Sequence, residues 1–279
     1  NTNDLFDIVM CFYEKISPEL YKFLENKFFK LNSKNKKTFI NNFISDILKN
    51  GIYTHQPPFF NNINLDILAD LYETFDVKPL NFVDIDNDGN LDLWACHDVA
   101  QSHAYRNDGN GNLLFDISLM STLPVGGNYQ SQWADLNNDG KIDMYLSKCR
   151  GSAPAGDPQR INLYYKNNGD GTYSEAGAVA GINDGAQSWA SAIEDYDNDG
   201  DMDIMLSNIS DTNKFYRNNG DGTFTDIYPS SGIAAQVGSW EIQAGDFNND
   251  GWMDFFWQNA KEMYLNNGDM TFTGYDLPF

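Results

Sequence analysis

Short apolar stretches alternate with polar turns from residue 77 onward, in a pattern that occurs four times. In the third copy the stretches read "MDIMLSN", "NKFYRN" and "TFTDIY", and a further strand leads into Asp195. The turns contain Asn-Gly and Asp-Gly steps, which favour tight connections between antiparallel strands because Gly and Asn tolerate positive φ angles. Each copy therefore predicts four short strands, as in one blade of a β-propeller.

We expect a mainly β domain at residues 77–279, a propeller whose four-stranded blades lie at about 78–120, 128–178, 187–230 and 238–275. The longer second unit accommodates the Gly- and Pro-rich segment 149–160 as a loop between strands. Four blades are at the small end of the known range, so they can close into a ring or form a partial arc. We favour the closed ring; in an arc, residues 51–60 or the N-terminal helices would fill the gap.

Residues 1–76 follow a helical pattern instead. Apolar residues such as Leu5, Ile8 and Phe12 recur at helical spacing. Ser17-Pro18 is a typical helix start and Asn50-Gly51 a typical helix end. We therefore predict an α-helical N-terminal region with a linker at 55–60 and helices at about 4–15, 18–30, 36–49 and 64–75.

An acidic loop follows the first strand of each blade: "DIDNDGNLD", "DLNNDGKID", "DYDNDGDMD" and "DFNNDGWMD". Counted from its first Asp, each loop has carboxylate or amide side chains at positions 1, 3, 5 and 9, a Gly at position 6 for a sharp turn, and a backbone carbonyl at position 7. This all-oxygen set suits Ca²⁺. The candidate ligands, with position 7 acting through its carbonyl, are Asp84, Asp86, Asp88, Asn90, Asp92, Asp135, Asn137, Asp139, Lys141, Asp143, Asp195, Asp197, Asp199, Asp201, Asp203, Asp246, Asn248, Asp250, Trp252 and Asp254.

Four copies with one spacing favour about four Ca²⁺ sites over solvated acidic turns, because crowded carboxylates repel one another unless a cation lies among them. Positions 1 to 5 resemble an EF-hand loop, but an EF-hand has a bidentate Glu at position 12 and flanking helices. Position 12 lies here within a predicted strand and is Ala95, Leu146, Leu206 or Trp257. Position 9 is therefore expected to supply the last carboxylate.

The motif D-x-D/N-x-D-G-x-x-D, followed by Y-x-N-N-G-D-G-T-F, resembles the FG-GAP/VCBS repeat of integrin-α-type β-propellers. The segment "NKFYRNNGDGTFTDIYPSSGIA" is especially similar to the repeats of the cartilage acidic protein and ASPIC/UnbV group. The resemblance covers about residues 78–274 and implies Ca²⁺ in the strand-connecting loops and an extracellular location. Asn137 and Asn248 replace an acid at position 3, which implies weaker binding at those two sites. Full rings of the family often have seven blades, whereas this sequence contains four.

The net charge of −22 argues against nucleic acid and anionic membranes as partners, because like charges repel. The sequence has no run of about 18 apolar residues, so no membrane span is expected. The chain begins at Asn1 rather than Met, which is typical of a processed N-terminus. Cys96 and Cys149 follow equivalent strands and could form one disulfide, whereas Cys11 is expected to be a buried thiol.

Six residues before each acidic loop, three of the four blades carry an aromatic residue: Tyr129, Trp189 and Trp240, with Lys78 in the first blade. Rings at one repeat position are expected to cluster, either as a stacking platform for a ligand such as a sugar or as packing between blades. Asn208 begins the single N-glycosylation sequon and adds slight support for an extracellular location.

Three functions follow from these patterns. The leading one is a non-catalytic, Ca²⁺-stabilised extracellular or cell-surface propeller that binds a protein or a glycan in adhesion or recognition. The second is a structural subunit of a homo-oligomer or filament that assembles through the N-terminal helices, since "FDIVMCFYEKI" is apolar enough to enter a partner's groove. The third is a hydrolase or lyase, which we do not favour because no nucleophile motif, phosphate-binding loop or carboxylate pair occurs outside the acidic loops.

Overall fold

The computed structural model describes residues 80–277 apart from 210, 235–237 and 259–260. The predicted N-terminal helices, the linker at 55–60, Cys11 and Lys78 lie outside the described residues, so the predictions for them stay predictions. Among the described residues, no helix combines the length and the apolar character needed to cross a lipid bilayer.

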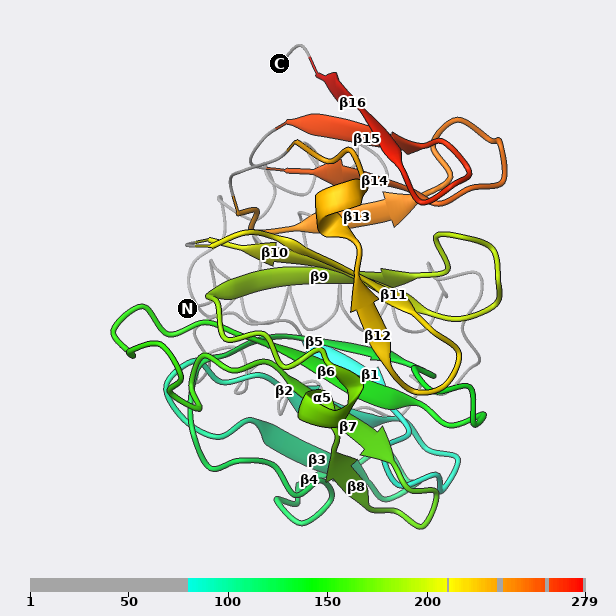
Figure 1. The fold of residues 1–279 in the computed structure, drawn as a ribbon. Coiled ribbons are helices and arrows are strands. Elements are labelled where there is room, and N and C mark those ends of the chain that lie inside the picture. The colour runs from blue at the N-terminus through cyan, green and yellow to red at the C-terminus, as the bar shows by residue number, and fades with distance from the viewer. Residues whose placement is uncertain (1–79, 210, 235–237, 259–260, 278–279) are drawn as a thin grey trace, which may run out of the picture.

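The described chain forms four antiparallel sheets of four strands each, and in every sheet the strands pair in chain order (Figure 1). Blade 1 contains β1 (Leu80–Val83), β2 (Asp92–Ala95), β3 (His103–Asn107) and β4 (Leu113–Phe115). Blade 2 contains β5 (Asn128–Ala134), β6 (Asp143–Lys148), β7 (Leu163–Asn167) and β8 (Tyr173–Glu175). Blade 3 contains β9 (Ser188–Glu194), β10 (Asp203–Asn208), β11 (Lys214–Asn218) and β12 (Phe224–Asp226). Blade 4 contains β13 (Ile242–Gly245), β14 (Asp254–Trp257), β15 (Glu262–Asn266) and β16 (Phe272–Asp276). The four predicted four-stranded units are thus confirmed.

One register places the acidic loop in every blade. The last residue of the first strand pairs with the position-9 Asp, which is the first residue of the second strand. In blade 3, for example, Glu194 pairs with Asp203, so that the eight residues between them must form the loop. The same sequence pattern therefore takes the same position in all four blades.

The second strand of blades 1, 2 and 3 is buried on both faces. All six residues of β6 and of β10 are buried, as are all four of β2. In blades 2 and 3, neighbouring blades cover both faces of the second strand, so its apolar residues stand in a continuous run, at 144–146 and 204–206, rather than alternating. The outer strands β4 and β12 bury only their first residues, Leu113 and Phe224.

Three hydrophobic cores lie between successive blades. The core between blades 1 and 2 includes Trp94 and Tyr165, and the core between blades 2 and 3 includes Tyr145 and Tyr216. The core between blades 3 and 4 is built largely of aromatic rings, including Phe255. A closed ring of four blades would need a fourth core between blades 4 and 1, and the described residues contain none. Figure 1 accordingly shows an arc with blades 1 and 4 at opposite ends, and ring closure stays a prediction.

Smaller features complete the fold. The segment 149–160 lies between β6 and β7, as predicted for the longer second unit. A short helix, α5 (Gly177–Ala180), and a 3-10 turn, η2 (Tyr228–Ser230), follow blades 2 and 3 and were not predicted. Cys96 and Cys149 are buried, and the Cys96 thiol donates to Ser131 Oγ at 3.5 Å, so the two cysteines do not form the disulfide considered from the sequence.

Candidate metal loops and aromatic surface

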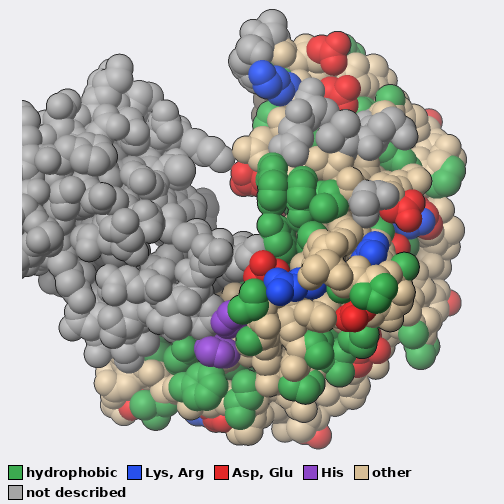
Figure 2. All heavy atoms as spheres, turned by 90° about the vertical axis from the view of Figure 1, so that its left-hand side faces the viewer, with side chains coloured by type: hydrophobic (Ala, Val, Ile, Leu, Met, Phe, Trp, Pro, Cys, Tyr) green, Lys and Arg blue, Asp and Glu red, His purple; other side chains and the backbone are tan. Residues whose placement is uncertain are grey.

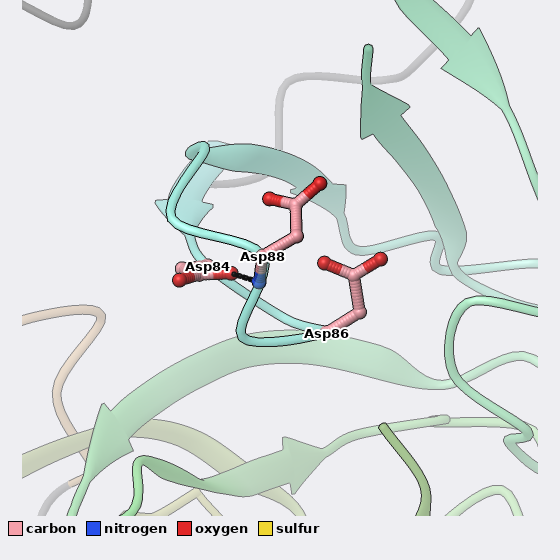
Figure 3. Close-up of side chains that lie close together, drawn as sticks. All are labelled: Asp84, Asp86 and Asp88. Carbon is pink, nitrogen blue, oxygen red and sulfur yellow. Dashed lines mark hydrogen bonds between the residues drawn. The ribbon is translucent and has the colours of Figure 1, made fainter. Parts of the chain in front are cut away.

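The four acidic loops share one backbone conformation. The Asn at position 4 is left-handed in every loop, with φ between 56° and 61°, and the Gly at position 6 has φ between 81° and 95°. Asn and Gly are the residue types that best tolerate this region, which is why both recur at these positions. They turn the chain back on itself, and Figure 3 shows the result in the first loop, where Asp84, Asp86 and Asp88 lie close together.

The position-1 aspartate organises each loop. Its two carboxylate oxygens accept hydrogen bonds from the N–H groups of positions 5 and 6 at 2.7–3.1 Å in all four loops. The position-5 carboxylate accepts a bond from the N–H of position 7 at 2.8–3.1 Å. A carboxylate oxygen has two lone pairs, so each of these oxygens keeps capacity for a cation. The ligand role of the position-7 carbonyls stays a prediction.

The position-9 aspartates lie deepest in the loops, with fully buried side chains: Asp92, Asp143, Asp203 and Asp254. One oxygen accepts the N–H of position 2 and the other accepts the N–H of an Asn in the following motif, at 2.8–3.1 Å. Burial raises the pKa of Asp92 to about 6 and that of Asp203 to about 7, although the backbone hydrogen bonds act in the opposite direction. A nearby cation would favour the ionised form, so buried carboxylates of this kind suit a metal site.

Four buried asparagines hold these loops, and the sequence analysis did not identify them. They are the Asn residues of the four Y-x-N motifs: Asn107, Asn167, Asn218 and Asn266. The side-chain amide of each donates to the carbonyl of position 8 in its own loop, at 3.0–3.2 Å. The signal was present in the sequence, because this Asn recurs at one place in all four motifs, but its partner is distant in the chain.

The same asparagines join neighbouring blades. Two of them also donate to the position-2 carbonyl of the preceding blade, and these bonds are Asn218 to Leu136 (3.0 Å) and Asn266 to Tyr196 (2.8 Å). In blade 2 a tyrosine completes the link, since Asn167 donates to Tyr173 Oη at 3.2 Å and Tyr173 Oη donates to the carbonyl of Ile85 at 3.0 Å. The acidic loop of one blade is therefore anchored to the next blade.

Two of the four loops bring three carboxylates close enough to hold one cation. In each group, one oxygen from every residue lies within 4.8 Å of the others; the groups are Asp84, Asp86 and Asp88, and Asp195, Asp197 and Asp203. Asp86 Oδ1 is buried and has no hydrogen-bond partner. Buried carboxylate oxygens are rarely left unsatisfied, so this atom fits a metal ligand. The donor sets of the first and third loops therefore fit a hard divalent cation such as Ca²⁺.

The loops of blades 2 and 4 have an Asn in place of the acid at position 3. Its amide donates within the loop, from Asn137 Nδ2 to Asp143 Oδ2 at 2.8 Å and from Asn248 Nδ2 to Asp250 Oδ2 at 2.8 Å. These hydrogen bonds relieve part of the repulsion between carboxylates without a metal. The second and fourth loops therefore fit a cation less well than the other two.

The three predicted aromatic residues lie together. The rings of Trp189 and Trp240 stack with centroids 3.6 Å apart and planes 9° apart, and the Tyr129 ring lies 6.2 Å from that of Trp240. They occupy the starting ends of β5 and β9 and the segment before β13, at the opposite end of the strands from the acidic loops. Figure 2 views this end of the blades and shows hydrophobic side chains gathered there. Trp240 is 54% exposed, so the cluster is not closed over as an ordinary core would be.

Asn208, the first residue of the sequon, is buried in blade 3. Its side-chain amide donates to Asp184 Oδ2 at 2.6 Å and to the carbonyl of Thr212 at 2.8 Å, and its Oδ1 accepts a bond from Ser188 Oγ. A glycan on this nitrogen would require the loss of these bonds, because Asn208 is only 1% exposed in the folded chain.

Comparison with known proteins agrees with the repeat architecture. A family described as FG-GAP-like repeat matches residues 84–146, 155–206 and 195–257. A solved structure of a lectin from Agrocybe aegerita, described as recognising non-reducing terminal N-acetylglucosamine, is similar with a TM-score of 0.43 and 21% identity over 69% of this chain. This chain covers 49% of the lectin chain, about half its length. A search of the curated proteins found no match. The three family matches span more than half of the sequence and include the acidic loops, so this chain belongs to the FG-GAP-like repeat family.

Proposed function

We propose that this protein is a non-catalytic, Ca²⁺-stabilised recognition module that acts outside the cell or on its surface. Its ligand, a glycan or a protein, binds at the surface formed by Tyr129, Trp189 and Trp240, which we call the aromatic surface. The acidic loops at the other end of the blades hold Ca²⁺ and keep the blades ordered.

The observation that carries the proposal is the stacked pair of indoles, of which Trp189 is half-buried and Trp240 is exposed. Trp240 is 54% exposed although it stacks closely on Trp189. Aromatic residues at a solvent-facing surface are enriched in binding sites, because they offer a large, rigid apolar face with a polar edge. The apolar C–H face of a pyranose ring matches such a face, and so does an aromatic or aliphatic side chain of a protein partner.

The calcium part of the proposal is supported by the first and third loops. Each gathers three carboxylates around one point, and the buried Asp86 Oδ1 has no other partner. Bound Ca²⁺ would supply positive charge among like-charged groups, so metal binding and folding of the blades are coupled. Millimolar Ca²⁺ is available outside cells, where FG-GAP-type loops would be saturated even at modest affinity.

A glycan array tests the ligand part of the proposal. Fluorescently labelled protein is applied in roughly 2 mM Ca²⁺, which is enough to fill Ca²⁺ sites of extracellular modules, and again after chelation. We expect the double variant Trp189→Ala/Trp240→Ala to lose binding by about tenfold or more. The matched control is Phe115→Ala/Tyr275→Ala, whose rings are 56% and 51% exposed on outer strands.

The outcome separates ligand recognition from general stickiness. Binding that survives loss of both indoles would refute the aromatic surface as the binding site. Equal loss in the control variant would show that exposed rings anywhere on the molecule account for the signal. Circular dichroism of both variants, with a melting curve, confirms that the fold is retained.

A further inference from the structure

The four acidic loops differ in the cations that the protein itself places beside them. In the first loop, Arg106 on β3 forms an ion pair through Nη1 with Asp86 Oδ2, while its Nε contacts Asp116 Oδ2 at 3.2 Å. Asp116 is itself held by the N–H and hydroxyl groups of Ser118. The Asp86 side chain is only 13% exposed. A guanidinium is therefore fixed against the carboxylate whose other oxygen is unsatisfied.

The third loop lacks such a cation. Arg217 occupies the same place in its repeat, in "YRNNGDGTF" against "YRNDGNGNL" in the first. It is exposed, and within the described part of the chain no ion pair joins it, or any other basic side chain, to the acidic loop of blade 3. The third loop also has five aspartates in nine positions, at 195, 197, 199, 201 and 203. Its negative charge is thus the least compensated.

The second and fourth loops complete the comparison. In the second loop, Lys141 and Lys166 approach Asp139 Oδ2 at 3.2 Å and 3.6 Å. In the fourth loop, the residue equivalent to Arg106 is Leu265. This loop has one carboxylate fewer than the first loop because Asn248 stands at position 3. Only the first loop thus combines a close group of three carboxylates with a fixed internal cation among the described residues.

A fixed monovalent cation has opposite effects on the empty and the occupied loop. It relieves the repulsion among carboxylates when no metal is present, and it repels a divalent ion that binds a few ångströms away. By linkage, a group that prefers the empty loop lowers the affinity of that loop for metal by the same factor. Solvent and salt screen the effect at a partly exposed site, so about tenfold in affinity is the expected scale.

We propose that Arg106 is the internal counter-ion of the first acidic loop and that it sets an order of Ca²⁺ loading. The third loop fills first, and the first loop fills only at a higher Ca²⁺ concentration because Ca²⁺ must bind against Arg106. This inference rests on the Ca²⁺ part of the proposed function and is independent of the aromatic surface. The first loop therefore keeps part of its order through Arg106 when Ca²⁺ is removed, whereas the third loop loses more of its order.

Hydrogen exchange of the backbone N–H groups, followed by mass spectrometry during a Ca²⁺ titration, tests the order at each loop separately. The reporters are the N–H groups of Asp88 and Gly89 in the first loop, which donate to Asp84. The equivalent groups in the third loop belong to Asp199 and Gly200. We expect the protection midpoint for 195–203 at a Ca²⁺ concentration about tenfold below that for 84–92.

Arg106→Gln and Arg217→Gln form a matched pair, because each removes one positive charge at the same repeat position. Arg106→Gln is expected to lower the midpoint for 84–92 by about tenfold and to leave that for 195–203 in place. It should also increase exchange at 84–92 in chelator. Arg217→Gln should move neither midpoint.

Two results would overturn the inference. A midpoint for 84–92 that stays in place or rises in Arg106→Gln would show that Arg106 supports the metal site rather than opposing it. If either loop of the unchanged protein shows no protection up to millimolar Ca²⁺, that loop does not bind Ca²⁺ and the proposed order of loading is refuted. Glycan binding is not measured in this experiment, so failure of the aromatic surface leaves the result intact.

Discussion

Replacing Asn218 by Ala removes a buried link between blades 2 and 3. The Asn218 side chain is 2% exposed and makes three hydrogen bonds. It donates to the carbonyls of Leu136 and Met202 at 3.0 Å and 3.1 Å, and it accepts a bond from the N–H of Gly220 at 3.1 Å. The Leu136 carbonyl belongs to the acidic loop of the preceding blade, so one of the three bonds crosses the interface.

The cost follows from the number of groups left unsatisfied. Each lost bond to a buried backbone group is worth about 1 kcal/mol, and an orphaned carbonyl adds to this, so Asn218→Ala should cost about 3 kcal/mol. For a domain of this size, 1 kcal/mol corresponds to roughly 2–4 °C in melting temperature. We therefore expect a fall of about 6–12 °C.

Two variants calibrate the measurement, which is urea denaturation in saturating Ca²⁺ combined with a melting curve. Asn107→Ala removes the equivalent side chain in blade 1, where the described bonds are to the Leu91 carbonyl and the Gly109 N–H and none crosses to another blade. It should cost about 2 kcal/mol. Asn219→Ala changes the exposed neighbour, which donates to Thr223 Oγ1 and accepts a bond from Thr225 Oγ1, and because both bonds are exposed to solvent it should cost well under 1 kcal/mol. If Asn218→Ala costs no more than Asn107→Ala, the inter-blade bond contributes nothing and the reasoning is refuted.

Two further perturbations probe the opposite end of the blades. Gly127 has φ of +79°, and a Cβ there would lie 2.0 Å from the carbonyl oxygen of Gln159, so Gly127→Ala should lower the free energy of unfolding by at least about 3 kcal/mol in urea denaturation. Gly185→Ala should be nearly neutral, because a Cβ at Gly185 would meet nothing within 4 Å. Equal effects of the two substitutions would contradict the clash at Gly127. The buried Lys148 amine donates to oxygens in the segment 126–128, and burial lowers its pKa from 10.5 to about 8. The unfolded chain then binds more protons between about pH 8 and 10.5, so stability should rise with pH across that window and level off at its lower value below about pH 8, where the amine is protonated in both states. Urea midpoints measured from pH 7 to 10 should show this rise in the unchanged protein and not in Lys148→Met. Parallel pH curves for the two proteins would show that Lys148 does not cause the rise.

Much of the fold could be read from local patterns because the repeat displays them four times. Alternation of apolar residues and Asn-Gly turns predicted sixteen strands in four sheets, and the structure confirms the four sheets. The left-handed Asn at position 4 and the Gly at position 6 explain why the spacing of the acidic loop is the same in every blade. These are local constraints on φ angles and strand register, and they act within about ten residues of the chain.

Contacts between blades were not predictable in the same way. Nothing near Asn218 in the sequence indicates that its amide reaches Leu136, 82 residues earlier. The burial of Asn208 against Asp184 likewise depends on how the segment before β9 packs, so a surface sequon and a buried asparagine look the same in the sequence. Arg106 and Arg217 stand in almost identical motifs, yet only Arg106 reaches an acidic loop among the described residues.

The sequence by itself determined the repeating unit: four strands, an acidic loop with oxygen donors at set spacings, and a glycine-rich turn. It did so because these features depend on short-range steric and hydrogen-bonding rules that each copy repeats. Only the tertiary structure decided that the four described blades pack in series, that Trp189 and Trp240 stack at one end, and that Arg106 lies against Asp86 in the first loop. Those outcomes depend on which side chains meet across blade interfaces, and small differences between copies, such as an arginine turned inward or outward, are settled only when the blades pack.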